Sequence, residues 1–142
     1  MNSLFWLFGL ISLAVATFAL APPYGQLKTV GAHITNSAGT PVQLRGLSLF
    51  TSHYIPDYWN ATSVNQIKCG WNSNVIRAPL GISSTCCGGW VETRDREYKR
   101  MKTVIDAAID NGIYVIVDWH AFSAQLDLAK GFFANISKTY GS

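Results

Sequence analysis

Two positions in this sequence combine a chemically active side chain with a strongly apolar setting. Arg77 lies inside the apolar run 74–79 (NVIRAP), and His120 follows the apolar run 113–117 (IYVIV) by three residues. A charge inside such a run is costly unless it is paired. Arg77 is therefore expected either to be neutralised by a structural carboxylate or to hold a catalytic carboxylate ionised and in place.

The segment around His120 places polar groups on one side of a strand. Side chains alternate along a strand, so Asp118 and His120 share one face and Trp119 points to the other. An imidazole at a strand end can hydrogen-bond a substrate hydroxyl, or it can be a satisfied core histidine, and both alternatives stay open. Asp118 is expected to support the packing of the strand.

Aromatic side chains in the intervening loops are of the kind that binds sugars. Sugar rings present apolar C–H faces that aromatic rings cover well, while their hydroxyls need polar partners. Trp59, Tyr54, Tyr58 and Trp90 fall in loops near the expected site. For each of them taken singly, ordinary packing is the alternative.

The elements that would position these residues alternate between strands and helices. Such alternation defines an α/β fold, and either a doubly wound sheet or a barrel can begin this way. Sites in parallel α/β folds form at the carboxyl ends of the strands. No glycine-rich phosphate loop follows any strand, so no nucleotide cofactor is expected. We predict a small β-hairpin (31–35 and 41–44), strands at 44–50, 74–79 and 113–117, and helices at 60–69, from about 94 to Asn111-Gly112, and at about 124–140.

The N-terminus predicts export. Residues 4–20 are almost unbroken apolar, and Ala19-Leu20-Ala21 gives an A-x-A pattern before two prolines. This pattern is typical of a secretory signal peptide at 1–21, with a mature, extracellular domain at 22–142 that makes no membrane contact after cleavage. A membrane anchor helix is the alternative. The formal net charge of +3, without a run of Lys or Arg, does not favour nucleic acid as a partner.

The three cysteines are expected to form one disulfide in an oxidising compartment. Neighbouring cysteines rarely pair because the geometry is strained. We therefore expect Cys69 to bond Cys86 or Cys87. A zinc site is not expected, because no histidine lies at ligand spacing from these sulfurs.

Five segments in order resemble glycoside hydrolase family five, and within it the secreted cellulases (endo-β-1,4-glucanases) of bacteria and plant-parasitic nematodes. They are YGQL, PVQLRGLSLF, WNSNVIRAPLGI, IDAAIDNGIYVIVDWH and AKGFFANISKTYGS. The resemblance implies a (β/α)₈ (TIM) barrel, of which this chain would form about the first three βα units after the hairpin. It also implies a monomeric enzyme, without metal or cofactor, that hydrolyses β-1,4-glucan with retention.

The resemblance assigns roles to particular residues. Arg77 would support the nucleophile carboxylate, and His120 would contact the sugar at the cleavage site. Trp119, Trp59 and Tyr54 are expected to bind substrate or to support the site. The chain departs from this pattern at Thr51, where a tryptophan is common, and at residues 121–123, where polar residues are usual.

The acidic residues do not supply a catalytic pair. Retaining glycosidases use two carboxyl groups about 5 Å apart. Of the eight acids, only Asp118 and Asp57 are expected near the site, whereas Glu92, Asp95 and Glu97 are expected around a helix start, away from strand ends. We expect the acid/base and nucleophile glutamates to lie outside this sequence, so that the chain is inactive alone. The alternative function is a non-catalytic secreted glucan-binding protein.

Overall fold

The computed structural model describes residues 20–83, 86–123 and 125–141. These residues form a short antiparallel hairpin followed by three parallel strands, each with a helix after it. Most of the predicted signal peptide, residues 1–19, lies outside the described residues, so that interpretation stays a prediction. No helix within the described ranges is long and apolar enough to cross a membrane.

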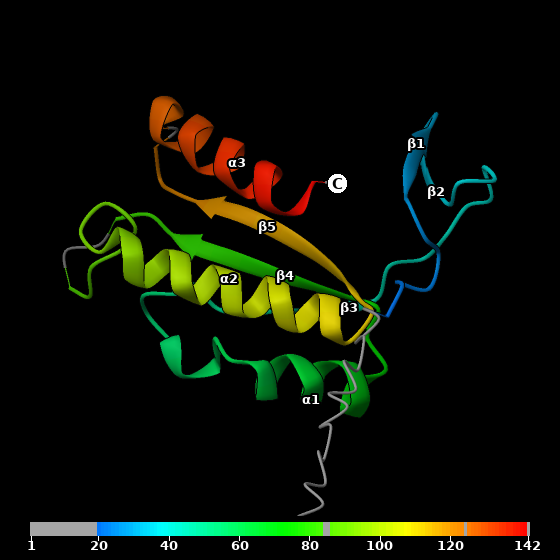
Figure 1. Ribbon diagram of the computed structural model, residues 1–142, viewed down its shortest axis with the longest axis horizontal. Helices are drawn as coiled ribbons and strands as arrows, with labels where there is room; N and C mark the ends of the chain where they lie inside the picture. Colours follow the sequence, from blue (N-terminus) through cyan, green and yellow to red (C-terminus); the bar gives the residue numbers. More distant parts are fainter. Residues whose placement is uncertain (1–19, 84–85, 124, 142) are drawn as a thin grey trace, which may run out of the picture.

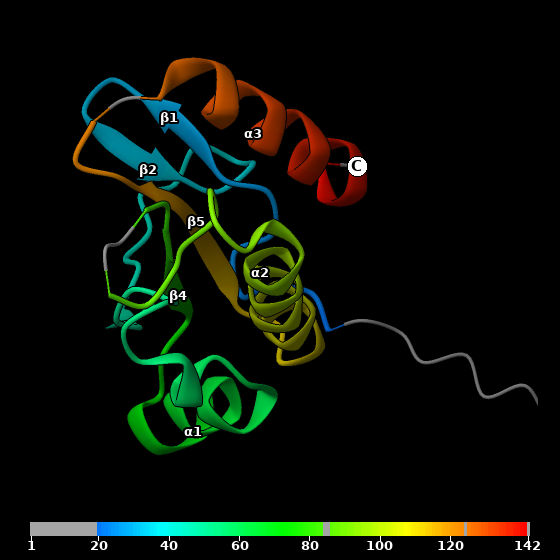
Figure 2. The same ribbon diagram turned by 90° about the vertical axis from the view of Figure 1, so that its left-hand side faces the viewer.

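The parallel sheet has the order β3-β4-β5, with β3 at Gly46–Ser48, β4 at Val75–Gly81 and β5 at Tyr114–His120. Figures 1 and 2 show that the helices α1 (Ala61–Trp71), α2 (Arg94–Asp110) and α3 (Leu126–Tyr140) all lie on one side of this sheet. A doubly wound sheet carries helices on both faces, whereas a barrel wall carries them only outside. The described units therefore have the winding of a barrel wall, as predicted.

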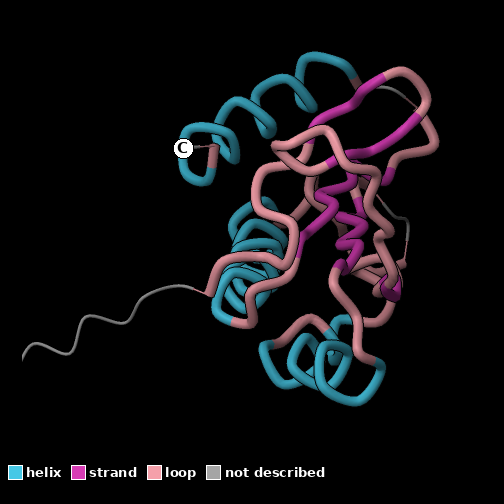
Figure 3. Tube along the Cα trace, turned by 90° about the vertical axis from the view of Figure 1, so that its right-hand side faces the viewer, coloured by secondary structure: helices cyan, strands magenta, loops and turns pink. Residues whose placement is uncertain are grey.

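The hairpin forms earlier in the chain than predicted. β1 (Lys28–Val30) pairs antiparallel with β2 (His33–Thr35). The turn between them uses Gly31 at φ +58°, a left-handed conformation that glycine adopts without strain. The segment predicted as the second strand, 41–44, contributes a single bridge between Thr35 and Pro41. Figure 3 shows the hairpin in front, and Figure 1 places it beyond the amino ends of β4 and β5.

Local sequence explains where the helices begin and end. Asn60 caps α1, because its side-chain oxygen accepts a hydrogen bond from the Ser63 backbone N–H at 2.9 Å. α2 ends one residue before Asn111, and Gly112 at φ +61° turns the chain into β5. The end of α2 predicted at Asn111-Gly112 is thus confirmed.

The hydrophobic core lies between the sheet and its helices. Alternate residues of β4 enter it, where they meet one face of α2. Their burial stabilises the fold by about 1.5–3 kcal/mol for each large aliphatic side chain. The other face of the sheet is open, and Ile116 of β5 is 50% exposed there. The core residues of these two elements with 0% exposure are Ile76, Ala78, Leu80, Met101, Val104 and Ala108.

Candidate functional site

The register of the sheet brings polar side chains together on its open face. Arg77 of β4 pairs with Ser48 of β3 and with Ile116 of β5. Residues paired across parallel strands point to the same face, and alternation then puts Asp118 and His120 on that face as well. The open face therefore becomes polar toward the carboxyl ends of the strands.

Arg77, Asp118 and His120 form one contact cluster. The Arg77 Nη2 atom lies 2.5 Å from Asp118 Oδ2, and His120 Nδ1 lies 3.1 Å from the same oxygen. Arg77 Nη2 is 3.3 Å from His120 Nδ1, and Arg77 Nη1 donates to Ser48 Oγ at 3.1 Å. Arg77 is thus paired with the Asp118 carboxylate, and this contact is compatible with both alternatives. Asp118 holds both partners, beyond the packing role expected for it.

A pocket of about 210 Å³ adjoins this cluster. Its lining combines Arg77 and His120 with aromatic rings and with polar side chains of the loop that follows β3. Phe122, from the segment that departs from the family pattern, is 96% exposed at its rim. Apolar walls with a few polar groups are typical of small-molecule sites. The other lining residues are Leu49, Phe50, Thr51, His53, Tyr54, Pro79 and Ser83.

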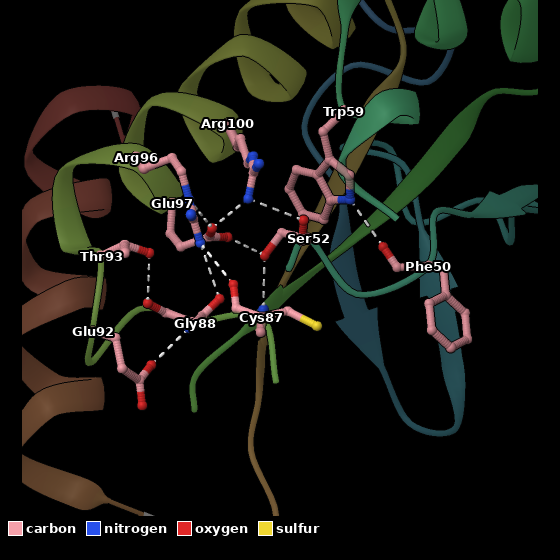
Figure 4. A network of polar contacts seen from close by, with 12 residues as sticks. Phe50, Ser52, Trp59, Cys87, Gly88, Glu92, Thr93, Arg96, Glu97 and Arg100 are labelled. Atoms are coloured by element: carbon pink, nitrogen blue, oxygen red, sulfur yellow. Dashed lines mark hydrogen bonds and ion pairs between the residues drawn. The ribbon is translucent and has the colours of Figure 1, made fainter. Parts of the chain in front are cut away.

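A buried carboxylate fixes the loop after β3. Glu97, in the first turns of α2, has 0% exposure and accepts a hydrogen bond from the Ser52 hydroxyl (Figure 4). Arg100 Nη1 lies 2.5 Å and Arg96 Nε 3.1 Å from Glu97 Oε1. The Ser52 hydroxyl oxygen also accepts from the Gly81 backbone N–H at 3.0 Å. One acidic side chain thus joins α2 to the carboxyl ends of β3 and β4.

The hydrogen bonds that Ser52 makes with Glu97 and Gly81 also hold the neighbouring residue His53 against β4. A Cβ atom on Gly81 would lie 1.5 Å from His53 Nδ1, so the imidazole occupies the space that a side chain at 81 would need. The ring stacks at an angle on Tyr54, with the centroids 4.1 Å apart. Burial lowers the pKa of the His53 imidazole, against the opposing charges of Glu97 and Glu92. His53 is therefore a neutral side chain at neutral pH.

The predicted aromatic residues separate into two groups. Tyr54 lines the pocket, as expected. Trp59 does not, because its ring is buried in the core and its Nε1–H donates to the Phe50 carbonyl at 2.9 Å (Figure 4). Trp119 faces the helix layer, where its ring lies 6.0 Å from Trp90 and 5.4 Å from Phe132 between centroids. Neither Trp59 nor Trp119 lines this pocket, and Trp119 packs on the face of β5 opposite His120.

The expected pairing of Cys69 is wrong. Cys69 is free and exposed near the carboxyl end of α1, and Cys86 is bonded to Cys87. α1 runs antiparallel to β4, so Cys69 lies toward the amino end of the strands, while Cys86 and Cys87 follow their carboxyl end. The seven residues of β4 span about 23 Å, far beyond the reach of a disulfide. No three metal-ligating side chains gather within the part of the chain that the structure describes.

Two residues of this region, His53 and Glu97, were missed by reasoning from sequence, and Thr51 was noted only as a departure from the family pattern. His53 lies in a loop without periodicity, and nothing in the sequence indicates that it faces Arg77. Glu97 was expected to lie away from strand ends, but the first turns of α2 pack directly beside the loop that leaves β3. An acidic residue at an otherwise apolar helix position was the only available signal for Glu97.

The comparisons with known proteins agree with this architecture. The family model "Cellulase (glycosyl hydrolase family 5)" matches residues 35–142. The chain is 33% identical to an endoglucanase of Clostridium saccharobutylicum over 82% of its own length, and 34% identical to endoglucanase E-5 of Thermobifida fusca over 84%. It spans only 27% and 26% of these two relatives.

Solved structures give the same result. The catalytic domain of the Thermobifida fusca endoglucanase superposes with a TM-score of 0.77 at 31% identity, over 84% of this chain and 40% of that one. A structure from Cytophaga hutchinsonii gives 0.77 at 38% identity, over 83% and 38%. The fold is that of part of a glycoside hydrolase barrel. The chain belongs to the cellulase family, glycosyl hydrolase family 5.

Proposed function

We propose that this chain forms the Arg77–His120 side of the substrate groove of a secreted endo-β-1,4-glucanase with a retaining mechanism. The observation that carries the proposal is the meeting of Arg77, Asp118 and His120 on the open face of the sheet, where His120 is the carboxyl-terminal residue of β5. Active sites of (β/α)₈ enzymes form at this end of the barrel. The matched relatives are named endoglucanases, and a variant of the Thermobifida fusca domain was solved with cellotetraose, which supports β-glucan as the substrate.

The cluster has a defined chemical task in this proposal. Asp118 and Ser48 hold the Arg77 guanidinium at the pocket, where its remaining N–H groups would stabilise a carboxylate nucleophile. The closer contact of His120 Nδ1, to Asp118 at 3.1 Å, favours Nδ1–H as the donor. Nε2 is then free to accept a hydrogen bond from a sugar hydroxyl.

The bond-breaking acids are assigned to other parts of the barrel. Retention needs two carboxyl groups about 5 Å apart, one as acid/base and one as nucleophile. Asp118 is engaged by Arg77, Glu97 is buried under Ser52, and Asp57 does not line the pocket. We propose that both glutamates come from later strands, and that these 142 residues alone do not cleave glucan.

A chimeric barrel tests the proposal. The chain is assayed for release of reducing sugar from carboxymethylcellulose, alone and joined to the part of the Thermobifida fusca domain that follows its third strand–helix unit. We expect no hydrolysis by the chain alone and hydrolysis by the chimera. Arg77→Lys should lower kcat/KM of the chimera at least about tenfold, equivalent to about 1.4 kcal/mol.

The matched control is Arg94→Lys, because Arg94 lies on α2 over the ring of Trp90 and outside this pocket. This substitution should leave kcat/KM within about twofold. A soluble, folded chimera without hydrolysis, or equal effects of the two substitutions, would contradict the proposal.

A non-catalytic glucan-binding protein is the second candidate. It is favoured by one observation, the aromatic and polar lining of the pocket beside Arg77, which among the described residues includes no carboxylate. Trp59 and Trp90 are buried and cannot act as its sugar platforms, so Tyr54 and Phe122 take that place. Binding of cellotetraose by the protein without any hydrolysis in the chimera would favour this candidate.

The proposal includes export of a monomer whose partner is glucan rather than nucleic acid or membrane. It is supported by the apolar N-terminal run and the A-x-A pattern that ends at Ala21. Intact mass and N-terminal sequencing of the protein recovered from culture medium should give Pro22 as the first residue. Retention of residues 1–21 in a membrane fraction would show an anchor instead.

A further inference from the structure

The loop that follows β3 carries buried polar atoms that have no partner. His53 is 7% exposed, and neither of its ring nitrogens makes a hydrogen bond among the described residues. The hydroxyl oxygen of Thr51, two residues earlier, is likewise buried and unpartnered. Buried polar groups without partners cost about 1–3 kcal/mol each, so proteins rarely keep them without a reason.

Both side chains line the pocket that also contains Arg77 and His120. The loop holds Thr51 and His53 in place, because Ser52 between them makes hydrogen bonds with Glu97, with the Gly81 backbone N–H and with the Pro79 carbonyl. The position of the His53 ring is further fixed by its contact with Gly81 and Tyr54. Thr51 and His53 are therefore held in place at the pocket that contains the cluster, with the Nδ1 edge of the imidazole against Gly81.

The chemistry of this group matches a sugar unit. A neutral imidazole offers one N–H donor and one nitrogen acceptor, and a threonine hydroxyl can do both. A pyranose presents adjacent hydroxyls that also donate and accept. Phe50, Tyr54 and Phe122 supply aromatic surface for the C–H face of the ring, and a pocket of about 210 Å³ suits one such ring.

We propose that Thr51 and His53 form a subsite beside Arg77 and His120, in which the imidazole and the hydroxyl bind hydroxyl groups of one glucosyl unit. The proposal rests on the glucan-binding function proposed above and deepens it. The subsite determines affinity and orientation of the sugar, and takes no part in bond cleavage.

Two shape-conserving substitutions in the full-length protein test the subsite. His53→Phe keeps the ring contacts with Tyr54 and Gly81, and Thr51→Val keeps the branched shape of the side chain. Each removes unpartnered buried polar atoms, so each should raise the midpoint of thermal unfolding. Each should also weaken cellotetraose binding, measured by calorimetry, by about fivefold to tenfold. Opposite movements of stability and affinity are the signature of a binding role.

Histidine resonances provide a direct readout in the unaltered protein. Cellotetraose should shift the imidazole signals of His53 and His120, while His33, exposed on β2 beyond the amino ends of the sheet, should not move. Binding that shifts His120 alone, with unchanged affinity in both variants, would overturn the subsite and leave the proposed function standing. Absence of binding by the unaltered, folded protein would also overturn the subsite, whereas the proposed function is decided by hydrolysis in the chimera.

Discussion

Ser52 and Glu97 are 45 residues apart in sequence and share a buried hydrogen bond. This bond joins the loop after β3 to the first turns of α2, and the Gly81 N–H on the other side of Ser52 brings in β4. The Ser52 hydroxyl thus connects three elements around the pocket: the loop after β3, α2 and β4. The position of the loop depends on these hydrogen bonds as much as on the packing of the strands.

Glu97→Gln should destabilise the protein by about 2–3 kcal/mol. The substitution keeps the size of the side chain but removes the charge that pairs with Arg100 and Arg96. Both arginines remain partly exposed, so the loss stays below the about 3–5 kcal/mol seen when a fully buried pair is broken. The free energy of unfolding from urea titration measures it. Asp95→Asn, an exposed carboxylate of the same helix turn, is the control and should change stability by less than about 1 kcal/mol.

Tyr140→Phe should lower the free energy of unfolding by about 1 kcal/mol. The Tyr140 hydroxyl donates to Asp106 Oδ1 at 2.7 Å and thereby connects the last turn of α3 to α2. Burial and the hydrogen bond to Asp106 raise the pKa of Tyr140 above its ordinary value, which keeps the hydroxyl protonated. Tyr58→Phe, at a residue that is 61% exposed, should leave stability unchanged. Equal effects of the two substitutions would argue against the contact.

Stability should fall in mildly acidic solution partly through His53. Burial lowers the pKa of His53 below its ordinary value of 6.5, helped by His120 and Arg100 and opposed by Glu97 and Glu92. As the pH falls below about 6.5, the unfolded chain takes up this proton before the folded chain does, so the free energy of unfolding decreases. Above that pH the contribution is fully present.

The difference between wild type and His53→Phe isolates this contribution. The variant's stability advantage should grow from pH 8 to pH 5, by no more than about 1.4 kcal/mol per pH unit. His33→Gln is the matched control and should keep the wild-type pH dependence. A difference between wild type and His53→Phe that is independent of pH would contradict the depressed pKa.

Cys69 should be the reactive thiol of the folded protein. It is free and exposed, whereas Cys86 and Cys87 are bonded to each other. A maleimide should therefore label the native protein once, at Cys69, and all three cysteines after reduction and unfolding. Cys69→Ser should abolish the native label. Recovery of a peptide that links Cys69 to either of the other cysteines would contradict the structure.

The regular elements could be predicted from sequence because each has a local cause. Apolar runs predicted the three parallel strands, and the helical spacing of apolar residues together with Asn111-Gly112 predicted α2. Strand alternation correctly placed Asp118 and His120 on the open face and Trp119 on the other. The hairpin was predicted too far along the chain because Gly31 and the cluster 36–39 both favour a turn. Only the turn at Gly31 connects the two paired strands.

The errors at the site concern contacts between segments that are distant in sequence. Trp59 was predicted to bind substrate or to support the site, yet its ring is buried and its Nε1–H donates to the Phe50 carbonyl. Glu97, Thr51 and His53 acquire their roles only when α2 packs beside the loop after β3. The disulfide was misassigned because the direction of α1 relative to β4 separates Cys69 from its expected partners. Spacing along the chain carries none of this information.

The contact between His53 and Gly81 predicts how the sequences of related proteins vary at these two positions. The two residues share one volume, since a single added carbon at position 81 would overlap the imidazole. The residues at these two positions should consequently covary among related chains, so that a large side chain at one position occurs with a small residue at the other. A homologue that carried large side chains at both would have to displace the whole loop from β4, and with it the floor of the neighbouring pocket.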